Sequence, residues 1–413
     1  MVTSICIFED EKASQLYPLT LTRPVFDLRC GFTTLKEKIL RHFPLAAVSL
    51  HCREYLQEVI REQNPDQRVN ERDAEECLFI NGRLLAKAQF LQSLDTEREC
   101  IYWQEGCVVA AMLRGDNLRK VNLEQPVLFN LKNWRHIERV ETQATLICYP
   151  WQLVNRNAEE IAADFAALGR GGKSTGTVHQ SAVLLNAQGI YLGAGSQIKP
   201  GVVLDAEDGP IYIGNNTTIM ANAVIEGPAF IGGQSVIKVG AKIYAGTSIG
   251  EVCKVGGEVE ECIVHSHSNK QHEGFLGHAY LGQWVNLGAD TNNSDLKNNY
   301  GSVKVHINGE LVDSGETFVG LFVGDHSKAG INTMFNTGTV VGVMSNVFGA
   351  GFPPKFVPSF AWGGSERLVT HEIEKALDTA RRVMARRKAE MTQADARLFR
   401  EIYRLTDGER AGF

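Results

Sequence analysis

The sequence predicts an α/β domain, followed by a parallel β-helix and a C-terminal α-helix. Three observations support this prediction. Residues 1–150 contain only four of the 40 glycines, and short apolar runs alternate there with helix-like stretches. The middle of the chain carries aliphatic side chains at an unbroken six-residue period. After residue 364, apolar residues recur at helical spacing among many arginines and lysines.

These differences in composition divide the chain into four parts. Residues 1–150 alternate runs such as SICIF and CLFI with stretches such as TLKEKILRHF, as an α/β domain does. A linker helix is expected over residues 151–175, and the β-helix over residues 176–364. Residues 365–413 form a helical segment that packs on its own protein or on a partner subunit.

The six-residue period is the strongest signal in the sequence. It predicts short strands that each bury one aliphatic side chain and are joined by tight turns with glycine or another small residue. The same phase recurs before and after the central run, with breaks near residues 205–212 and 256–262. The central run consists of Ile213, Ile219, Ile225, Ile231, Ile237, Ile243, Ile249 and Val255.

Composition excludes several classes of protein. A net charge of −6 without a long basic run gives no electrostatic surface for nucleic acid. The nine cysteines are odd in number and show no CxxC spacing, which argues against a disulfide framework and a zinc finger. No stretch approaches the roughly 18 apolar residues that a membrane span needs, and no signal peptide is evident, so we expect a cytoplasmic protein.

The repeat fails between residues 256 and 322, and such failures tend to mark functional sites. With Leu287 setting the phase, His272 lies three residues after a repeat position at 269 and faces outward. Asp290 lies three residues after Leu287, so His272 and Asp290 are expected to stack in successive coils. An imidazole above a carboxylate is a suitable general base, which makes these two residues the catalytic candidates.

The segment after residue 292 leaves the repeat, and VKVHINGELV within it predicts a hairpin that turns at Asn308-Gly309. Such a loop can protrude into a groove of a neighbouring subunit, although a solvated polar loop has the same composition. Its candidates for contacts with phosphate or pantetheine are Lys297, Asn298, Asn299, Tyr300 and Lys304. Candidates for a phosphate site on preceding coils are Lys238, Lys242 and Lys254.

A zinc site is an alternative reading of the same histidines. His267 and His272 have the spacing of two zinc ligands on one chain of γ-class carbonic anhydrases, where a third histidine comes from across a trimer interface. His265, His278 and His326 are available as that third ligand. A β-helix without any catalytic function is a further alternative.

The run SNKQHEGFLGHAYLGQWVNLGADT, with KNNYGSVK and GDHSKAGINTMFNTGTVVG, resembles the acetyltransferase domain of the bifunctional GlmU-type family, in a variant bacterial branch. The repeat likewise resembles the left-handed β-helix of hexapeptide acyltransferases, which usually form trimers. The resemblance implies a homotrimer that transfers acetyl from acetyl-CoA to glucosamine 1-phosphate. It implies that His272 is the base that deprotonates the amine.

The resemblance also assigns substrate contacts by position. Asn286 matches the asparagine that contacts the sugar, and Asn299-Tyr300 resembles the Asn-Tyr pair of the active-site loop. Phe275 replaces a tyrosine of the family. Three lysines match or lie near the family's cationic positions: Lys238 for a phosphate-binding arginine, Lys254 for a substrate lysine, and Lys304 for the lysine of the loop.

The N-terminal run ICIFEDEKASQLYPLTLTRPV resembles a sugar nucleotidyltransferase, with departures. Glu11 and Ala13 replace glycines of the phosphate loop, and Val25 replaces a lysine. Asn81-Gly82-Arg83 stands where a metal-binding Gly-Asp is expected, and arginine cannot ligate Mg²⁺. Candidates for a replacement nucleotide site are Arg23, Asp27, Arg29, Lys36 and Asn81.

Two main hypotheses follow from the resemblance. In the first, the chain is bifunctional: it acetylates glucosamine 1-phosphate and then transfers uridylyl from UTP, with Mg²⁺, to form UDP-N-acetylglucosamine. In the second, the N-terminal domain is a degenerate sugar-nucleotide-binding module and only acetyl transfer occurs.

Overall fold

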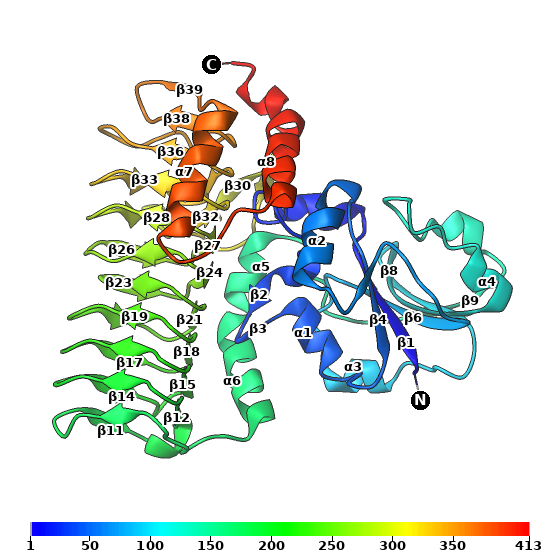
Figure 1. Cartoon of the computed structure of the whole chain (residues 1–413), viewed down its shortest axis with the longest axis horizontal. Helices are drawn as coiled ribbons and strands as arrows, with labels where there is room; N and C mark the ends of the chain where they lie inside the picture. Colours follow the sequence, from blue (N-terminus) through cyan, green and yellow to red (C-terminus); the bar gives the residue numbers. More distant parts are fainter. Residues whose placement is uncertain (1, 413) are drawn as a thin grey trace.

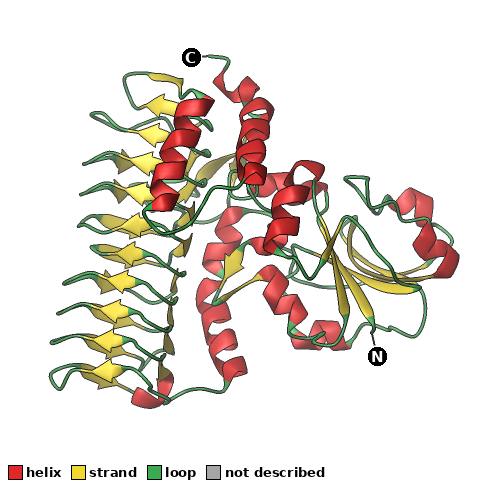
Figure 2. Ribbon diagram, in the orientation of Figure 1, coloured by secondary structure: helices red, strands yellow, loops and turns green. Residues whose placement is uncertain are grey.

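The computed structural model describes residues 2–412 of the 413-residue chain. It contains an α/β domain, a long β-helix and two C-terminal helices that lie against both (Figure 1). Figure 2 shows the strands of the β-helix stacked in parallel layers beside the linker helices. No helix in the described part of the chain is long and apolar enough to cross a membrane.

The N-terminal domain is built on a seven-stranded sheet. Strands β5, β4, β1 and β6 pair in parallel, and β8 joins β6 in the antiparallel direction. The five residues of β1 are all buried, as expected for a central strand covered on both faces. In sheet order the strands are β5 (Arg68–Val69), β4 (Ala47–His51), β1 (Ser4–Phe8), β6 (Glu76–Asn81), β8 (Cys107–Arg114), β7 (Cys100–Gln104) and β9 (Glu138–Glu141).

Short helices and one small hairpin complete this domain. The hairpin pairs β2 (Arg29–Cys30) with β3 (Thr33–Thr34), and a capping box between Thr34 and Glu37 starts the helix after it. The α-helices are α1 (Leu35–Leu40), α2 (Gln57–Gln63), α3 (Ala88–Gln92) and α4 (Gly115–Arg119). The 3-10 helices are η1 (Glu11–Leu16), η2 (Val25–Asp27), η3 (Glu54–Leu56) and η4 (Leu131–Trp134).

The β-helix has three faces, which we call first, second and third in chain order. The first face contains β10 (Thr177–Val178), β13 (Gln197–Ile198), β16 (Thr218–Ile219), β19 (Val236–Ile237), β22 (Lys254–Val255), β25 (Asn269–Lys270), β28 (Asn286–Leu287), β33 (Lys328–Ala329), β36 (Asn346–Val347), β38 (Ala361–Gly363) and β39 (Leu368–Thr370). The second contains β11 (Val183–Leu185), β14 (Val203–Asp205), β17 (Val224–Glu226), β20 (Lys242–Ile243), β23 (Glu258–Glu260) and β26 (Phe275–Gly277), and is continued by β29 (Asn292–Asn293) and β34 (Met334–Phe335).

The third face faces the N-terminal domain. It contains β12 (Ile190–Leu192), β15 (Ile211–Ile213), β18 (Ala229–Ile231), β21 (Thr247–Ile249), β24 (Ile263–Ser266), β27 (Tyr280–Gln283), β32 (Leu321–Val323), β35 (Thr339–Val341) and β37 (Phe356–Val357). A 3-10 helix, η5 (Ala187–Gly189), precedes it.

The predicted aliphatic column is confirmed. All eight residues of the central run, from Ile213 to Val255, are buried inside the coils. The predicted breaks are confirmed as changes in coil length. Ile190 pairs with Ile211, 21 residues on, whereas Ser248 pairs with Ile263, only 15 residues on. The six-residue period therefore located the regular coils and two of the places where coil length changes.

The linker and the C-terminal segment each form two helices. Helices α5 (Pro150–Asn155) and α6 (Asn157–Leu168) lie between the N-terminal domain and the third face (Figure 1). Helix α7 (Ile373–Ala385) runs beside the β-helix, and α8 (Gln393–Leu405) packs on α2, before a last 3-10 helix, η6 (Asp407–Arg410).

Loop residues after β1 pack directly on the third face. Leu16, Leu19 and Leu28 share one apolar cluster with Tyr280 and Phe322. The two domains therefore have a common core, and the segment that would form a phosphate loop is part of it.

Candidate functional site

His272 lies in the turn between β25 and β26, at the edge where the first and second faces meet. We call this the first edge. The side chain of His272 is exposed and makes no hydrogen bond within residues 2–412. The predicted stacking of His272 on Asp290 is wrong by one residue. Asn269 pairs with Asn286, so this coil has 17 residues instead of 18, and the Asp290 N–H donates to the carbonyl oxygen of Glu273 at 3.1 Å.

The shortened coil also moves the inward position from residue 269 to Lys270. Val255 pairs with Lys270, which places an ammonium group in the aliphatic column. Its Nζ donates to the carbonyl oxygens of His272 at 2.9 Å and Gly256 at 3.2 Å. Burial lowers the pKa of Lys270 to about 8. A polar residue in the column concealed the coil's phase in the sequence, yet Lys270 fixes the turn that presents His272.

Cations gather on the first face below this edge. Lys254 pairs with Asn269 across adjacent strands. The charge of Arg387, followed by burial and the charges of Lys238 and Arg386, lowers the pKa of Lys254. Four cations in one place favour an anionic ligand such as phosphate. Arg386 and Arg387 were not predicted as site residues, because arginines are expected on the polar side of the amphipathic helix that they follow.

Arg387 also orders the amides of this face. Its Nη2 donates to Asn269 Oδ1 at 2.6 Å and its Nη1 to the carbonyl oxygen of Val252 at 3.2 Å. Asn269 Nδ2 in turn donates to Asn286 Oδ1 at 3.4 Å. The structure thus brings predicted residues Lys238, Lys254 and Asn286 together on one face, beside the edge that carries His272.

The other predicted contacts lie elsewhere in the same chain. Phe275 begins the second-face strand β26, and its N–H donates to Asn292 Oδ1 at 2.7 Å. Asn299 and Tyr300 belong to an exposed loop at the opposite edge, where the second and third faces meet; Tyr300 is 71% exposed. The strands of the second face therefore separate this loop from His272 within one chain.

The hairpin predicted at Asn308-Gly309 is confirmed. Strand β30 (Lys304–Ile307) pairs with β31 (Glu310–Asp313), and both turn residues have positive φ. It does not protrude as expected. Val305 and Ile307 are buried against the N-terminal domain, because alternate apolar residues of the hairpin extend the shared core. Only the preceding loop, with Asn299 and Tyr300, projects.

His278 anchors that loop. Its Nδ1 lies 2.8 Å from Asp295 Oδ2 and its Nε2 lies 3.2 Å from Glu261 Oε2, and its ring packs on Phe318. Burial alone lowers the pKa of His278, but hydrogen bonds and charge from the two carboxylates outweigh it and raise the pKa to about 9. From its place in the sequence, His278 is predicted only as a third zinc ligand.

The strand ends of the N-terminal domain hold a closed ion pair. Arg83 Nη2 lies 2.6 Å from Asp10 Oδ2, its Nε donates to Asp10 Oδ1 at 2.8 Å, and Arg83 is fully buried. The predicted nucleotide residue Asn81 also donates to Asp10, at 2.9 Å. These carboxyl ends are where nucleotides bind in open parallel sheets. Because Arg83 occupies the carboxylate, this set of side chains does not fit Mg²⁺.

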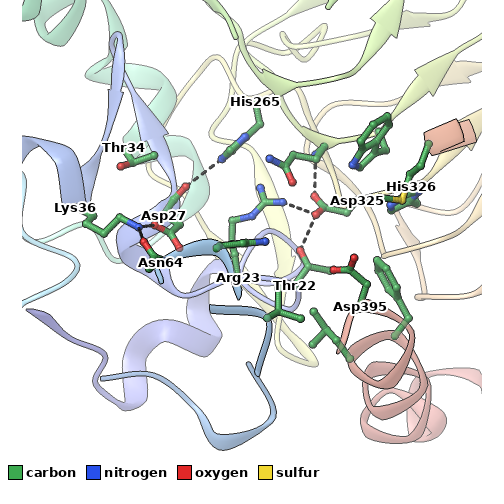
Figure 3. A pocket seen from close by; sticks show the side chains of 17 residues that line it. Thr22, Arg23, Asp27, Thr34, Lys36, Asn64, His265, Asp325, His326 and Asp395 are labelled. Atoms are coloured by element: carbon green, nitrogen blue, oxygen red, sulfur yellow. Dashed lines mark hydrogen bonds and ion pairs between the residues drawn. The ribbon is translucent and has the colours of Figure 1, made fainter. Parts of the chain in front are cut away.

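Three of the other four predicted nucleotide residues meet in a cavity at the domain junction. Arg23, Asp27 and Lys36 line it, and Lys36 Nζ lies 2.8 Å from Asp27 Oδ1 (Figure 3). Arg29 lies outside, paired with Glu251 at 2.7 Å. No group of three His, Cys, Asp or Glu side chains between residues 2 and 412 is placed to hold a metal ion.

Comparison with known proteins covers both halves of the chain. The sequence model of the family described as sugar nucleotidyl transferase matches residues 5–173. A bifunctional sugar-1-phosphate nucleotidylyltransferase/acetyltransferase of Sulfurisphaera tokodaii is 30% identical over 189 residues, which are 40% of this chain and 46% of that protein. The bifunctional protein GlmU of Rippkaea orientalis is 25% identical over 256 residues, which are 57% of this chain and 51% of that protein.

The chain thus spans about half the length of these curated relatives. Among solved structures, the UDP-N-acetylglucosamine acyltransferase of Francisella novicida is 14% identical, covering 57% of this chain and 77% of that one, with a TM-score of 0.29. A likeness at that score does not inform the choice of substrate. The curated relatives support a likeness to GlmU-type bifunctional proteins, and the family model supports a sugar nucleotidyltransferase domain at the N-terminus of the chain.

Proposed function

We propose that the chain transfers an acetyl group from acetyl-CoA to the amine of an amino-sugar phosphate, glucosamine 1-phosphate, at the first edge of the β-helix. One observation carries this proposal: the exposed imidazole of His272 lies beside the face that gathers Lys238, Lys254 and Arg387. An imidazole free of protein partners can accept a proton, and the neighbouring cations can hold a phosphate.

The proposed chemistry balances with His272 alone as the proton carrier. The imidazole takes a proton from the acceptor amine while the nitrogen lone pair attacks the thioester carbon, and a C–N bond forms. The C–S bond then breaks, and the CoA thiolate leaves with a proton from the imidazolium. Asp290 has no role in this scheme, since its neighbour in the adjacent coil is Glu273 and not His272.

The same proposal includes a homotrimer. Within one chain the loop with Asn299, Tyr300 and Lys304 lies at the edge away from His272, so a neighbouring copy has to supply it. Exposed apolar side chains near the first edge support a contact between copies there. They are Val239, Ile331, Met334 and Phe348.

Subunit mixing tests this arrangement. His272→Ala and Tyr300→Ala chains are each expected to be inactive in release of free CoA. If the site is shared, refolding them together restores about a quarter of wild-type activity, because random mixing makes that share of sites intact. A mixture as inactive as its components would show that each chain supplies its own complete site.

For the N-terminal domain we propose uridylyl transfer from UTP to N-acetylglucosamine 1-phosphate, supported by the family model over residues 5–173. A second candidate, binding of a sugar nucleotide without reaction, is favoured by the pair between Arg83 and Asp10. Release of pyrophosphate from UTP, N-acetylglucosamine 1-phosphate and Mg²⁺ separates the two. Acetyl transfer without pyrophosphate release would leave the second candidate.

A further inference from the structure

A cavity of about 380 Å³ lies where the N-terminal domain, the third face and helix α8 meet (Figure 3). Arg23 and Lys36 enter it from the N-terminal domain, His265 and His326 from the β-helix, and Phe399 from α8. The volume is in the range of small-molecule sites. The cavity is separate from the pair between Asp10 and Arg83 and from the first edge.

Three residues that line this cavity each carry one buried polar atom that lacks a hydrogen-bond partner among the residues that the structure describes. These atoms are Arg23 Nη1, His265 Nδ1 and His326 Nδ1, and their residues are 6%, 7% and 3% exposed. A buried polar atom without a partner costs about 1–3 kcal/mol. Three such atoms around one cavity indicate a ligand that pairs with them.

The hydrogen-bonding roles of two of these atoms are fixed by their surroundings. Arg23 Nη2 pairs with Asp325, so the guanidinium still has Nη1 to donate. His265 Nε2 lies 3.0 Å from the carbonyl oxygen of Asp27 and must donate to it. Burial lowers the pKa of His265 well below its usual value, so the ring is neutral and its Nδ1 can only accept. The ligand must offer both an acceptor and a donor.

Both cations of the cavity walls are paired with carboxylates, and a third carboxylate in the lining, Asp395, accepts from the Thr392 N–H. Arg23 and Thr22 are held by Asp325, and Lys36 by Asp27. No cation in this lining is therefore free to neutralise a phosphate group inside the cavity, as judged within residues 2–412. The bound part of the ligand therefore carries no negative charge.

Aromatic side chains supply flat surfaces in the same cavity. Trp284 stacks on His326 with ring centroids 5.9 Å apart, and His326 meets Phe399 edge to face at 5.3 Å. Flat surfaces of this kind suit a planar ring, and stacking of a base on an aromatic side chain contributes about 1–3 kcal/mol.

We propose that this cavity binds the base of a nucleoside or nucleotide, with any phosphates directed out to solvent. A nucleobase is planar and uncharged, and its edge carries an N–H beside an acceptor, as Arg23 Nη1 and His265 Nδ1 require. The ligand would bridge both domains and α8. This inference depends on neither candidate chemistry of the strand ends.

Calorimetric titration of the full chain with uridine, cytidine, guanosine and adenosine tests the inference. At least one nucleoside is expected to bind saturably with one site per chain. Arg23→Lys keeps a cation opposite Asp325 but lacks the second terminal nitrogen, so its affinity is expected to fall about tenfold or more. Absence of saturable binding by all four nucleosides would overturn the inference.

A second variant avoids the buried network. Gln63 is exposed on α2 and lines the cavity mouth, so Gln63→Trp is expected to block nucleoside binding without disturbing the fold. Glu62→Trp, exposed on the same helix but outside the lining, is the matched control and is expected to bind normally. Binding unaffected by Gln63→Trp, or abolished instead by Asp10→Ala, would place the nucleoside elsewhere and overturn the inference.

Discussion

The first edge of the β-helix and the strand ends of the N-terminal domain treat their charged groups in opposite ways. At the first edge, His272 is exposed without a protein partner and cations crowd together on the adjoining face. At the strand ends, Asp10, Asn81 and Arg83 satisfy one another. Crowded like charges are unfavourable unless a ligand compensates them, whereas a closed ion pair requires no ligand. The first edge is therefore the better candidate for the site of catalysis.

The largest expected effect is on catalysis at the first edge. His272→Ala should lower kcat for CoA release by about 10²–10⁴-fold, the usual contribution of a general base. His179→Ala is the matched control, because His179 is exposed at the first coil of the same edge. Equal rates for wild type and His272→Ala would remove the proposed base.

At the strand ends of the N-terminal domain, the expected effect is a loss of folding stability. Arg83→Ala leaves Asp10 largely buried without its cation and should cost about 3 kcal/mol in the free energy of unfolding, measured with urea. Arg119→Ala breaks an exposed pair with Asp116 and should leave the urea midpoint unchanged. An unchanged urea midpoint for Arg83→Ala would show that the pair between Asp10 and Arg83 does not stabilise the fold, which contradicts the contrast with the first edge.

Lys270, which is buried under the turn that carries His272, should make folding stability depend on pH. Its pKa is about 8 when folded and about 10.5 when unfolded, so the unfolded chain binds more protons between these values and stability rises with pH there. In Lys270→Met this rise should be smaller than in wild type, as judged by urea unfolding at pH 7.5 and 10. Parallel pH dependence of the two proteins would argue that the ammonium is not buried.

The smallest effect concerns the loop that His278 anchors. Its raised pKa gives a contribution that is fully present below pH about 6.5 and is lost as pH rises through about 9. Hydrogen exchange of residues 294–302, corrected for the intrinsic rate, should therefore show less protection at pH 9.5 than at pH 6.5. His278→Phe should abolish this difference, whereas His306→Phe on the hairpin should retain it.

The regular part of the fold was predictable from sequence because each regular coil buries aliphatic side chains at the same six-residue spacing. The column from Ile213 to Val255 reads directly from its spacing. The 17-residue coil could not be predicted from spacing, because its inward residue, Lys270, is polar. Its ammonium group donates hydrogen bonds to two carbonyl oxygens inside the coil. Phase was therefore extended from Leu287 with 18-residue coils, which misplaced Asp290.

The junction cavity could not be predicted from sequence for a different reason. Arg23 was a nucleotide candidate, but its partner Asp325 lies 302 residues away, and no local pattern links them. The same holds for Arg387, which meets Asn269 only because α7 runs beside the first face. Long-range charge pairing decides these sites, and spacing along the chain does not encode it.

The packing of α8 on α2 has a consequence for synthesis of the chain. Residues Gln63 and Gln393, at the facing ends of these helices, are 330 positions apart. Ribosomes add about 5–20 residues per second, so the apolar surface of α2 waits roughly 20–70 seconds for its cover. The apolar surface of α2 in the nascent N-terminal domain therefore stays uncovered during most of translation. Chaperones protect nascent chains from aggregation through exposed apolar surface of this kind.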